Sequence, residues 1–245
     1  LSIHRLYRVQ SPDRLQNYQG EPFIGIHSLG TLSPAKRMIA HLPEENLVLS
    51  VNSGFGGNSI LFKKCFSLRL ASWQARRDMW LAEHMAVFGV QDPTGRITYF
   101  AAALPSGCGK TNLSMLANAV LPGYKVWTVS DDLCWMHIGD DGRLWAINPE
   151  AGFFAIIKDT NEKTNPRLMN AISQGDAVFT NIAITADSKP WWTGIGEETP
   201  SGLTDWQGRQ WHENIGPVSH PNARVTLRAK NCENISLLMD YPYGV

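Results

Sequence analysis

The chain has 245 residues, of which 43% are hydrophobic and 18% charged, a balance typical of globular proteins rather than disordered ones. Lys and Arg together number 22, as do Asp and Glu, so no strong global field favours binding to nucleic acid. No apolar run approaches the roughly 18 residues of a membrane span, and we expect no membrane partner. The four cysteines are far apart and form no C-x-x-C pair. This argues against a zinc ribbon and favours a reducing, cytoplasmic compartment, with a mitochondrial one as the open alternative.

The first ninety residues predict two short strands, a glycine-rich loop and one long helix. FIGIHSL (23–29) and LVLSV (47–51) are typical of strands, and VNSGFGGNSI (51–60) of a loop. A helix is predicted over residues 61–90, because seven residues fall near helical spacing. They are Phe62, Phe66, Leu70, Trp73, Trp80, His84 and Val87.

The next segments alternate between strand and helix patterns. RITYFAAAL (96–104) predicts a buried strand, NLSMLANAVL (112–121) a short helix, and YKVWTVS (124–130) a strand that ends at Asp131 and Asp132. Later strand candidates are RLWAI (143–147), AVFTNIAI (177–184) and RVTL (224–227). The expected core includes Trp73, Trp80, Trp127, Trp135, Trp145, Trp191 and Trp192. A change in composition near Gln91 is the predicted domain boundary.

The loop LPSGCGKTN (104–112) lies between the predicted strand and the predicted helix. It resembles the phosphate-binding pattern G-x-x-x-x-G-K-[ST], but Leu104 occupies the place of the first glycine. In such a loop Lys110 would bind the β- and γ-phosphates, and Thr111 would offer its hydroxyl to a divalent metal. Asp131 or Asp132, at the end of the following strand, would reach the same metal. The alternative is a chance G-K-T followed by an ordinary turn.

Six blocks in a fixed order decide between these readings: GFGGNSILFKKCFSLRLAS, WLAEHMAVFGV, LPSGCGKTNLSML, LPGYKVWTVSDDLCWM, GRLWAINPEAGFF and TNPRLM. Together they resemble GTP-dependent phosphoenolpyruvate carboxykinase, whose loop reads close to FPSACGKTN and lacks the early glycine. The resemblance spans nearly all of residues 21–226 of a much longer family chain. It implies an α/β fold, with residues 1–90 as the end of a substrate-binding N-terminal domain. Residues 91–245 would form part of a P-loop-containing mononucleotide-binding domain.

The resemblance also implies a reaction, in which oxaloacetate and GTP give phosphoenolpyruvate, carbon dioxide and GDP during gluconeogenesis. It implies Mn²⁺ at the substrate site, Mg²⁺ or Mn²⁺ with the nucleotide, and a monomer at full length. Its metal ligands correspond to Lys64, His84 and Asp132, and its catalytic loop residues to Cys108 and Lys110. The substrate-binding residues it implies are Phe55, Gly56, Gly57, Ser106, Asn222 and Arg224. The nucleotide-binding residues it implies are Gly107, Cys108, Gly109, Lys110, Thr111 and Asn112.

Two other functions stay open beside this one. A catalytically silent, truncated relative would bind metal or nucleotide without turnover. An unrelated P-loop ATPase or kinase would need only the G-K-T loop and the acidic strand end. Taken alone, His84 is typical of a core histidine, and Lys64 beside Lys63 is typical of a solvated helix face.

Overall fold

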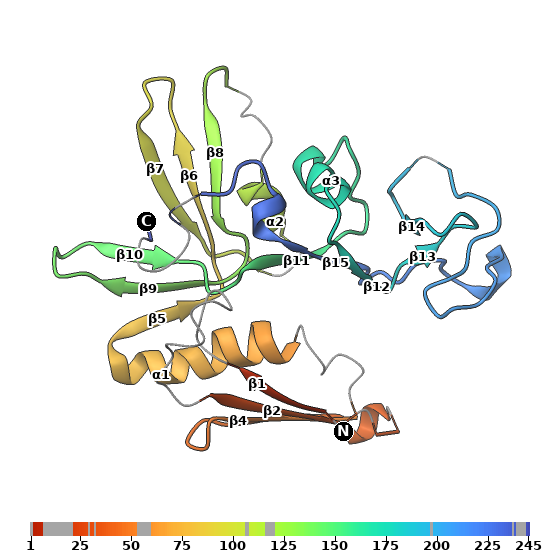
Figure 1. Ribbon diagram of the computed structural model, residues 1–245, viewed down its shortest axis with the longest axis horizontal. Helices are drawn as coiled ribbons and strands as arrows, with labels where there is room; N and C mark the ends of the chain where they lie inside the picture. The colour runs from red at the N-terminus through yellow and green to blue at the C-terminus, as the bar shows by residue number, and fades with distance from the viewer. Residues whose placement is uncertain are drawn as a thin grey trace.

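The structure of the chain is a computed structural model. It describes residues 2–6, 22–28, 30–31, 33–52, 60–105, 108–115, 121–196, 198–236, 238 and 244–245. Strands dominate over a few short helices, which confirms the mixed α/β class. Figure 1 shows the N-terminal sheet beneath α1, with the remaining sheets above α1 and to one side of it.

The N-terminal sheet has the strand order β1-β2-β4-β3. Its members are β1 (Ser2–Leu6), β2 (Phe23–Ser28), β3 (Met38–Leu42) and β4 (Leu47–Val51), with the 3₁₀ turn η2 (Pro34–Lys36) before β3. β2 and β4 match the two predicted strands. Alternate side chains of these strands are buried, and Phe23 meets Phe66 edge-on with ring centroids 4.8 Å apart. One face of the sheet therefore packs against the helical segment that follows it.

The long helix predicted over residues 61–90 is wrong in its second half. A π-type helix η3 (Ile60–Leu70) runs into α1 (Ala71–Asp78), which ends where Met79 takes a left-handed conformation with φ of 58°. Two strands follow, β5 (Trp80–Glu83) and β6 (Ala86–Gln91). The prediction failed because the spacing of Trp73, Trp80 and Val87 continues a helical stripe by coincidence, whereas strand pairing decides the backbone.

β6 is the centre of a three-stranded antiparallel sheet with the order β7-β6-β8. β7 (Ile97–Ala102) and β8 (Lys125–Ser130) lie where strands were predicted. The expected burial of β7 is wrong, because Ile97, Tyr99 and Phe100 are 36–47% exposed. Within the described part of the chain β7 pairs with β6 alone, so it is an edge strand of this sheet.

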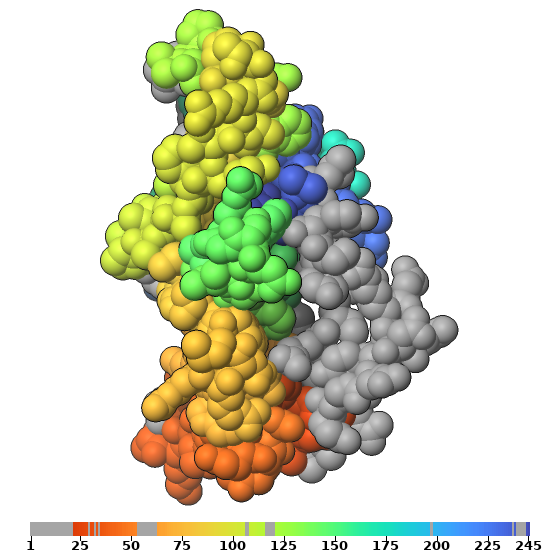
Figure 2. Space-filling view, turned by 90° about the vertical axis from the view of Figure 1, so that its left-hand side faces the viewer, coloured from red at the N-terminus to blue at the C-terminus, as the bar shows by residue number. Residues whose placement is uncertain are grey.

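A second antiparallel sheet has the order β10-β9-β5, with β9 (Cys134–Ile138) and β10 (Leu144–Ile147). Figure 2 shows the face on which the β6–β7 hairpin in yellow, the β9–β10 hairpin in green and α1 in orange lie one below another. β5 and β6 are joined by a two-residue turn, and β8 and β9 by three residues, so these two connections lie where the two sheets meet. The sequence segments 84–85 and 131–133 are therefore brought together.

The largest core lies around a third sheet of order β11-β15-β12 and the helix α3 (Pro166–Ser173). Its strands are β11 (Gly152–Ile156), β12 (Val178–Thr180) and β15 (Arg224–Arg228), with η5 (Ala229–Asn231) after β15. A small hairpin of β13 (Ala183–Ile184) and β14 (Pro190–Trp191) extends from it, with η4 (Glu213–Ile215) beyond. Of the seven tryptophans expected in the core, only Trp191 and Trp192 are buried, and the others are half-buried.

The described residues contain no helix long and apolar enough to cross a bilayer.

Asn165 fixes the start of α3 and connects it to the helix α2 (Lys110–Ser114). Its Oδ1 accepts a hydrogen bond from the Leu168 backbone N–H at 3.0 Å, and its Nδ2 donates to Asn112 Oδ1 at 2.7 Å. We expect Asn165→Ala to lower the free energy of unfolding by about 1 kcal/mol, the usual loss on removing a helix cap. A urea melt measures this. Asn165→Asp keeps the capping oxygen and serves as the control, so a loss as large as that of Asn165→Ala would contradict a capping role.

Candidate active site

Three side chains that are distant in sequence converge on one another, and Asp132 is the shared partner. Lys64 Nζ donates a hydrogen bond to Asp132 Oδ2 at 2.7 Å. His84 Nε2 lies 2.7 Å from Asp132 Oδ1. All three side chains remain partly accessible, with Lys64 and His84 each 32% exposed and Asp132 16%. The cluster therefore lies at the protein surface with its nitrogen and oxygen atoms within reach of a solute.

The pairing of strands explains why His84 and Asp132 meet. Glu83 pairs with Cys134 between β5 and β9, and Val87 pairs with Ser130 between β6 and β8. The chain turns from one sheet to the other at both places, so His84 lies opposite residues 131–133. Lys64 reaches the same point from η3, which packs against the N-terminal sheet.

Burial and the charges around Asp132 together shift the pKa values of all three groups. Burial raises the pKa of Asp132, but Lys63 and Lys64 outweigh this effect and hold the pKa well below its usual range. Burial lowers the pKa of Lys64 against the opposing effect of Asp132, and the charge of Lys63 lowers it further. Burial likewise lowers the pKa of His84 more than Asp132 raises it. The two nitrogen groups are thus biased toward their neutral forms, and the carboxyl toward its ionised form.

An imidazole nitrogen, a neutral amine and a carboxylate oxygen form a donor set that suits a divalent transition metal. The donor atoms of Lys64 and His84 each lie within 2.7 Å of a different oxygen of Asp132, so one ion could contact all three residues after a small rearrangement. No cluster of three His, Cys, Asp or Glu side chains with this capacity exists in the described parts of the chain. A metal site here therefore depends on the lysine as a ligand.

The glycine loop lies beside this cluster. Gly109 has φ of +86°, a conformation that favours glycine, and α2 begins at the next residue. Lys110 is only 5% exposed, and its Nζ donates to the Leu104 carbonyl at 2.5 Å and lies 3.6 Å from Asp132 Oδ1. Its ammonium group is therefore held between the loop and the cluster before any ligand binds. The expected helix over 112–121 starts two residues earlier, and residues 116–120 lie outside the described residues.

The two consecutive aspartates have different partners. Thr111 Oγ1 donates to Asp131 Oδ2 at 2.9 Å, so Asp131 faces the glycine loop while Asp132 faces Lys64 and His84. Asp131 is 1% exposed, and its Oδ1 finds no hydrogen-bond donor among the described residues. Burial raises the pKa of Asp131, opposed by the charge of Lys63. The free oxygen beside a threonine hydroxyl fits a cation held with a phosphate group.

Arg224 is the first residue of β15, and Asn222 lies two residues before it. Arg224 Nε donates to Asn222 Oδ1 at 2.9 Å, and the guanidinium stacks over the Phe154 ring, 4.7 Å from its centroid. Burial lowers the pKa of Arg224, and the nearby charge of Asp132 opposes this. The arginine is thus oriented by two contacts and lies within the field of the cluster. Phe55, Gly56, Gly57, Ser106 and Gly107 lie outside the described residues.

Comparison with known families shows what the chain is similar to. The family model described as the phosphoenolpyruvate carboxykinase C-terminal P-loop domain matches residues 80–245. The model described as the phosphoenolpyruvate carboxykinase N-terminal domain matches residues 1–76. The chain belongs to the phosphoenolpyruvate carboxykinase family. An unrelated P-loop ATPase or kinase is thereby excluded.

Curated relatives of the phosphoenolpyruvate carboxykinase family carry the name phosphoenolpyruvate carboxykinase [GTP]. One from Anaeromyxobacter sp. (strain K) is 48% identical over 223 residues, which is 90% of this chain and 37% of the relative. One from Chlamydia muridarum is 48% identical over 213 residues, or 87% of this chain and 35% of the relative. One from Chlamydia pneumoniae is 45% identical over 213 residues. The chain thus spans little more than a third of the length of these relatives.

Two buried charged residues beside this cluster were not predicted from the sequence. They are Lys63 and Glu150. Lys63 Nζ lies 3.0 Å from Asp132 Oδ2 and 3.5 Å from Glu150 Oε2. Burial disfavours the ammonium form of Lys63, yet the carboxylates of Glu150, Asp131 and Asp132 raise its pKa. Burial raises the pKa of Glu150 to about 7, against the effect of Lys63. The only sequence signal was that Glu150 falls inside the block INPEAGFF.

Cys108 differs from the other three cysteines of this carboxykinase-family chain. It is exposed, whereas Cys65, Cys134 and Cys232 are buried. Burial raises the pKa of Cys134 and of Cys232 to about 12 and suppresses their thiolates. We expect iodoacetamide to modify Cys108 at least about tenfold faster than any other thiol, as measured by mass spectrometry of peptides. Cys108→Ser is the control, and a fast-reacting thiol that persists in it would contradict this prediction.

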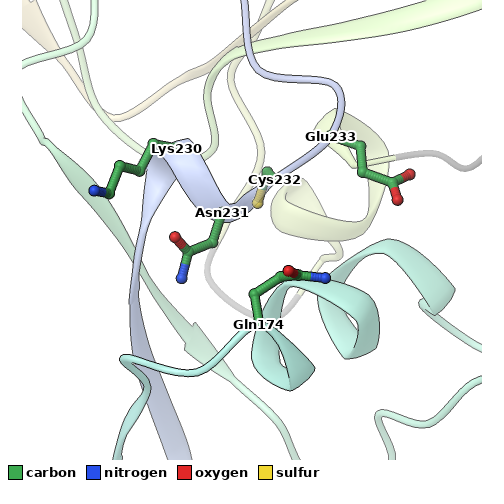
Figure 3. Close-up of a pocket in the computed structure, with 5 residues that line it drawn as sticks. All are labelled: Gln174, Lys230, Asn231, Cys232 and Glu233. Carbon is green, nitrogen blue, oxygen red and sulfur yellow. The ribbon is translucent and has the colours of Figure 1, made fainter.

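A depression of about 460 Å³ lies between the end of α3 and the segment after β15. It is lined by Gln174, Lys230, Asn231, Cys232 and Glu233. Figure 3 shows that the Lys230 and Glu233 side chains point to opposite sides and do not converge. No candidate site residue of the carboxykinase family lines it, so the depression is not the site described above.

Proposed function

We propose that this chain carries the metal-binding and phosphate-binding core of a GTP-dependent phosphoenolpyruvate carboxykinase. The reaction is the conversion of oxaloacetate and GTP to phosphoenolpyruvate, carbon dioxide and GDP, a step of gluconeogenesis. The observation that supports it most is the convergence of Lys64 and His84 on Asp132, with Lys110 3.6 Å from the same carboxylate. A cation site and a phosphate site that share one carboxylate suit phosphoryl transfer to an enolate.

Each group has a role that follows from its chemistry. Lys64, His84 and Asp132 would hold Mn²⁺, which as a Lewis acid stabilises negative charge on an enolate oxygen. Lys110 would bind the transferred phosphoryl group with its ammonium, and Thr111 with Asp131 would hold the cation of the nucleotide. Arg224, oriented by Asn222, would bind a carboxylate or phosphate of the substrate with its planar fork. These roles stay predictions, as do those of Cys108, Gly109 and Asn112, the boundary near Gln91 and the cytoplasmic location.

The second candidate is a silent relative that binds Mn²⁺ and nucleotide without turnover. The chain covers 37% of the relative from Anaeromyxobacter sp. (strain K), so turnover by these 245 residues needs its own test. Turnover needs a base pocket and a means of excluding water from the enolate, whereas binding of metal or nucleotide does not.

One experiment separates the two candidates. Mn²⁺-dependent formation of oxaloacetate from phosphoenolpyruvate, GDP and bicarbonate is followed by its reduction with NADH, alongside calorimetry with Mn²⁺ and with GDP. Turnover supports the carboxykinase. Binding of both ligands without turnover supports the silent relative, and a folded chain that binds neither contradicts both.

A further inference from the structure

Lys63 and Glu150 form a buried ion pair, and the proposed reaction assigns neither residue a role. Lys63 is 4% exposed and Glu150 is 7% exposed, whereas Lys64 beside them is partly accessible. Charged side chains are rarely buried to this degree unless each has a partner. Here the Lys63 Nζ lies between two carboxylates, 3.0 Å from Asp132 Oδ2 and 3.5 Å from Glu150 Oε2. The pair therefore lies on the buried side of Asp132.

Lys63 is suited to fix the direction of the Asp132 carboxylate. Asp132 Oδ2 faces Lys63 and Lys64 together, and Oδ1 faces His84. If Lys64 and His84 turn to a cation, Lys63 is the neighbour that still holds Oδ2 from the buried side. Groups that hold a metal-binding carboxylate from behind set its orientation, and their loss typically lowers metal affinity.

An ammonium group so close to a cation site would by itself repel a divalent ion. Glu150 places a carboxyl group 3.5 Å from Lys63 Nζ, and its ionised form offsets the charge of Lys63. Glu150 is held in turn, because its backbone N–H donates to Asn148 Oδ1 at 2.8 Å directly after β10. Lys63 thus gives Asp132 an ion-pair partner at 3.0 Å, and Glu150 reduces the electrostatic cost of a free lysine.

We propose that Lys63 and Glu150 are positioning residues of the cation site: Lys63 fixes Asp132 from the buried side, and Glu150 offsets the charge of Lys63. This inference rests on the proposed role of Lys64, His84 and Asp132 as metal ligands. Lys63 acts on the ligand Asp132, and Glu150 acts through Lys63.

The test is the dissociation constant for Mn²⁺ alone, measured on the 245-residue chain by electron paramagnetic resonance of the free ion. We expect Glu150→Gln to weaken Mn²⁺ binding about tenfold, since the charge of Lys63 is then left uncompensated. Asp187→Asn removes a carboxylate from an exposed ion pair with Lys189 and is the matched control, with unchanged affinity. Equal affinities in wild type and Glu150→Gln would overturn the inference alone. A folded wild type that does not bind Mn²⁺ would overturn the proposed metal site together with it.

A double variant separates positioning from a purely structural role. Lys63→Met with Glu150→Leu replaces the buried pair by apolar side chains of similar volume, which proteins often tolerate without loss of stability. We expect its melting temperature to return to that of the wild type while its Mn²⁺ affinity stays about tenfold lower. If the double variant instead binds Mn²⁺ as the wild type does, Asp132 needs no support from Lys63 and the proposal is wrong.

Discussion

Asp132→Asn lowers the affinity of the chain for Mn²⁺ by at least about 100-fold, and it is the substitution with the largest expected effect. Loss of a group behind a ligand already costs about 10- to 100-fold, and here the ligand itself is changed. The amide keeps the shape of the side chain but loses the charge that Lys63, Lys64 and His84 share. Titration with Mn²⁺ followed by electron paramagnetic resonance measures the loss.

The same variant should also be less stable, by about 3 kcal/mol, because Lys63 is buried and loses its nearest carboxylate. A urea melt beside the titration shows that the protein is folded under the conditions of the binding measurement. Asp187→Asn, in the exposed pair with Lys189, should change stability by less than about 0.5 kcal/mol. Folded Asp132→Asn protein with wild-type affinity for Mn²⁺ would show that the ion binds elsewhere.

Lys110→Met is expected to weaken GDP binding by about 10- to 100-fold, the value of a charge-assisted hydrogen bond of roughly 1.5–3 kcal/mol. Turnover in the oxaloacetate assay should fall further, by about 100- to 1000-fold, since negative charge on the phosphoryl oxygens grows during transfer. Lys110 is 5% exposed and anchored to the Leu104 carbonyl, so its ammonium is in place before the nucleotide arrives. Calorimetry with GDP and the coupled assay measure the two effects separately.

Lys125→Met is the matched control, because Lys125 is an exposed lysine at the start of β8. It should leave both GDP affinity and turnover unchanged. Lys110→Arg keeps the charge and should recover part of the binding. An equal loss in Lys125→Met would point to a general effect of net charge, and unchanged GDP affinity in Lys110→Met would remove this lysine from the phosphate site.

Local patterns were enough to predict the strands that have one clear period and firm ends. β2, β4, β8 and β10 lie within the predicted segments, and β8 ends at the two aspartates as expected. The helix predicted over residues 61–90 ends at Asp78 in the structure. The prediction failed there because apolar residues seven positions apart fit one helix and two short strands equally well. The predicted burial of β7 was wrong because composition does not reveal which strand lies at the edge of a sheet.

The candidate site depended on information that no local pattern holds. Lys64 and Asp132 are 68 residues apart and His84 and Asp132 are 48 apart. Strand pairing brings His84 to Asp132, and the placement of η3 brings Lys64 to them. The order of family blocks, rather than residue spacing, pointed to these three residues. Lys63 and Glu150 were missed because a charged residue is normally expected to be solvated, whereas here Lys63 of η3 and Glu150 after β10 are buried as an ion pair.

The peptide bond between Asp131 and Asp132 joins the two halves of this site. Asp131 contacts Thr111 of the glycine loop, and Asp132 contacts Lys64 and His84. A movement of the loop around a nucleotide would therefore reach Lys64 and His84, the groups that would bind the cation at the substrate site, through one peptide bond. We therefore expect occupancy of one half to change the affinity of the other, and thermodynamic linkage requires the factor to be the same in both directions.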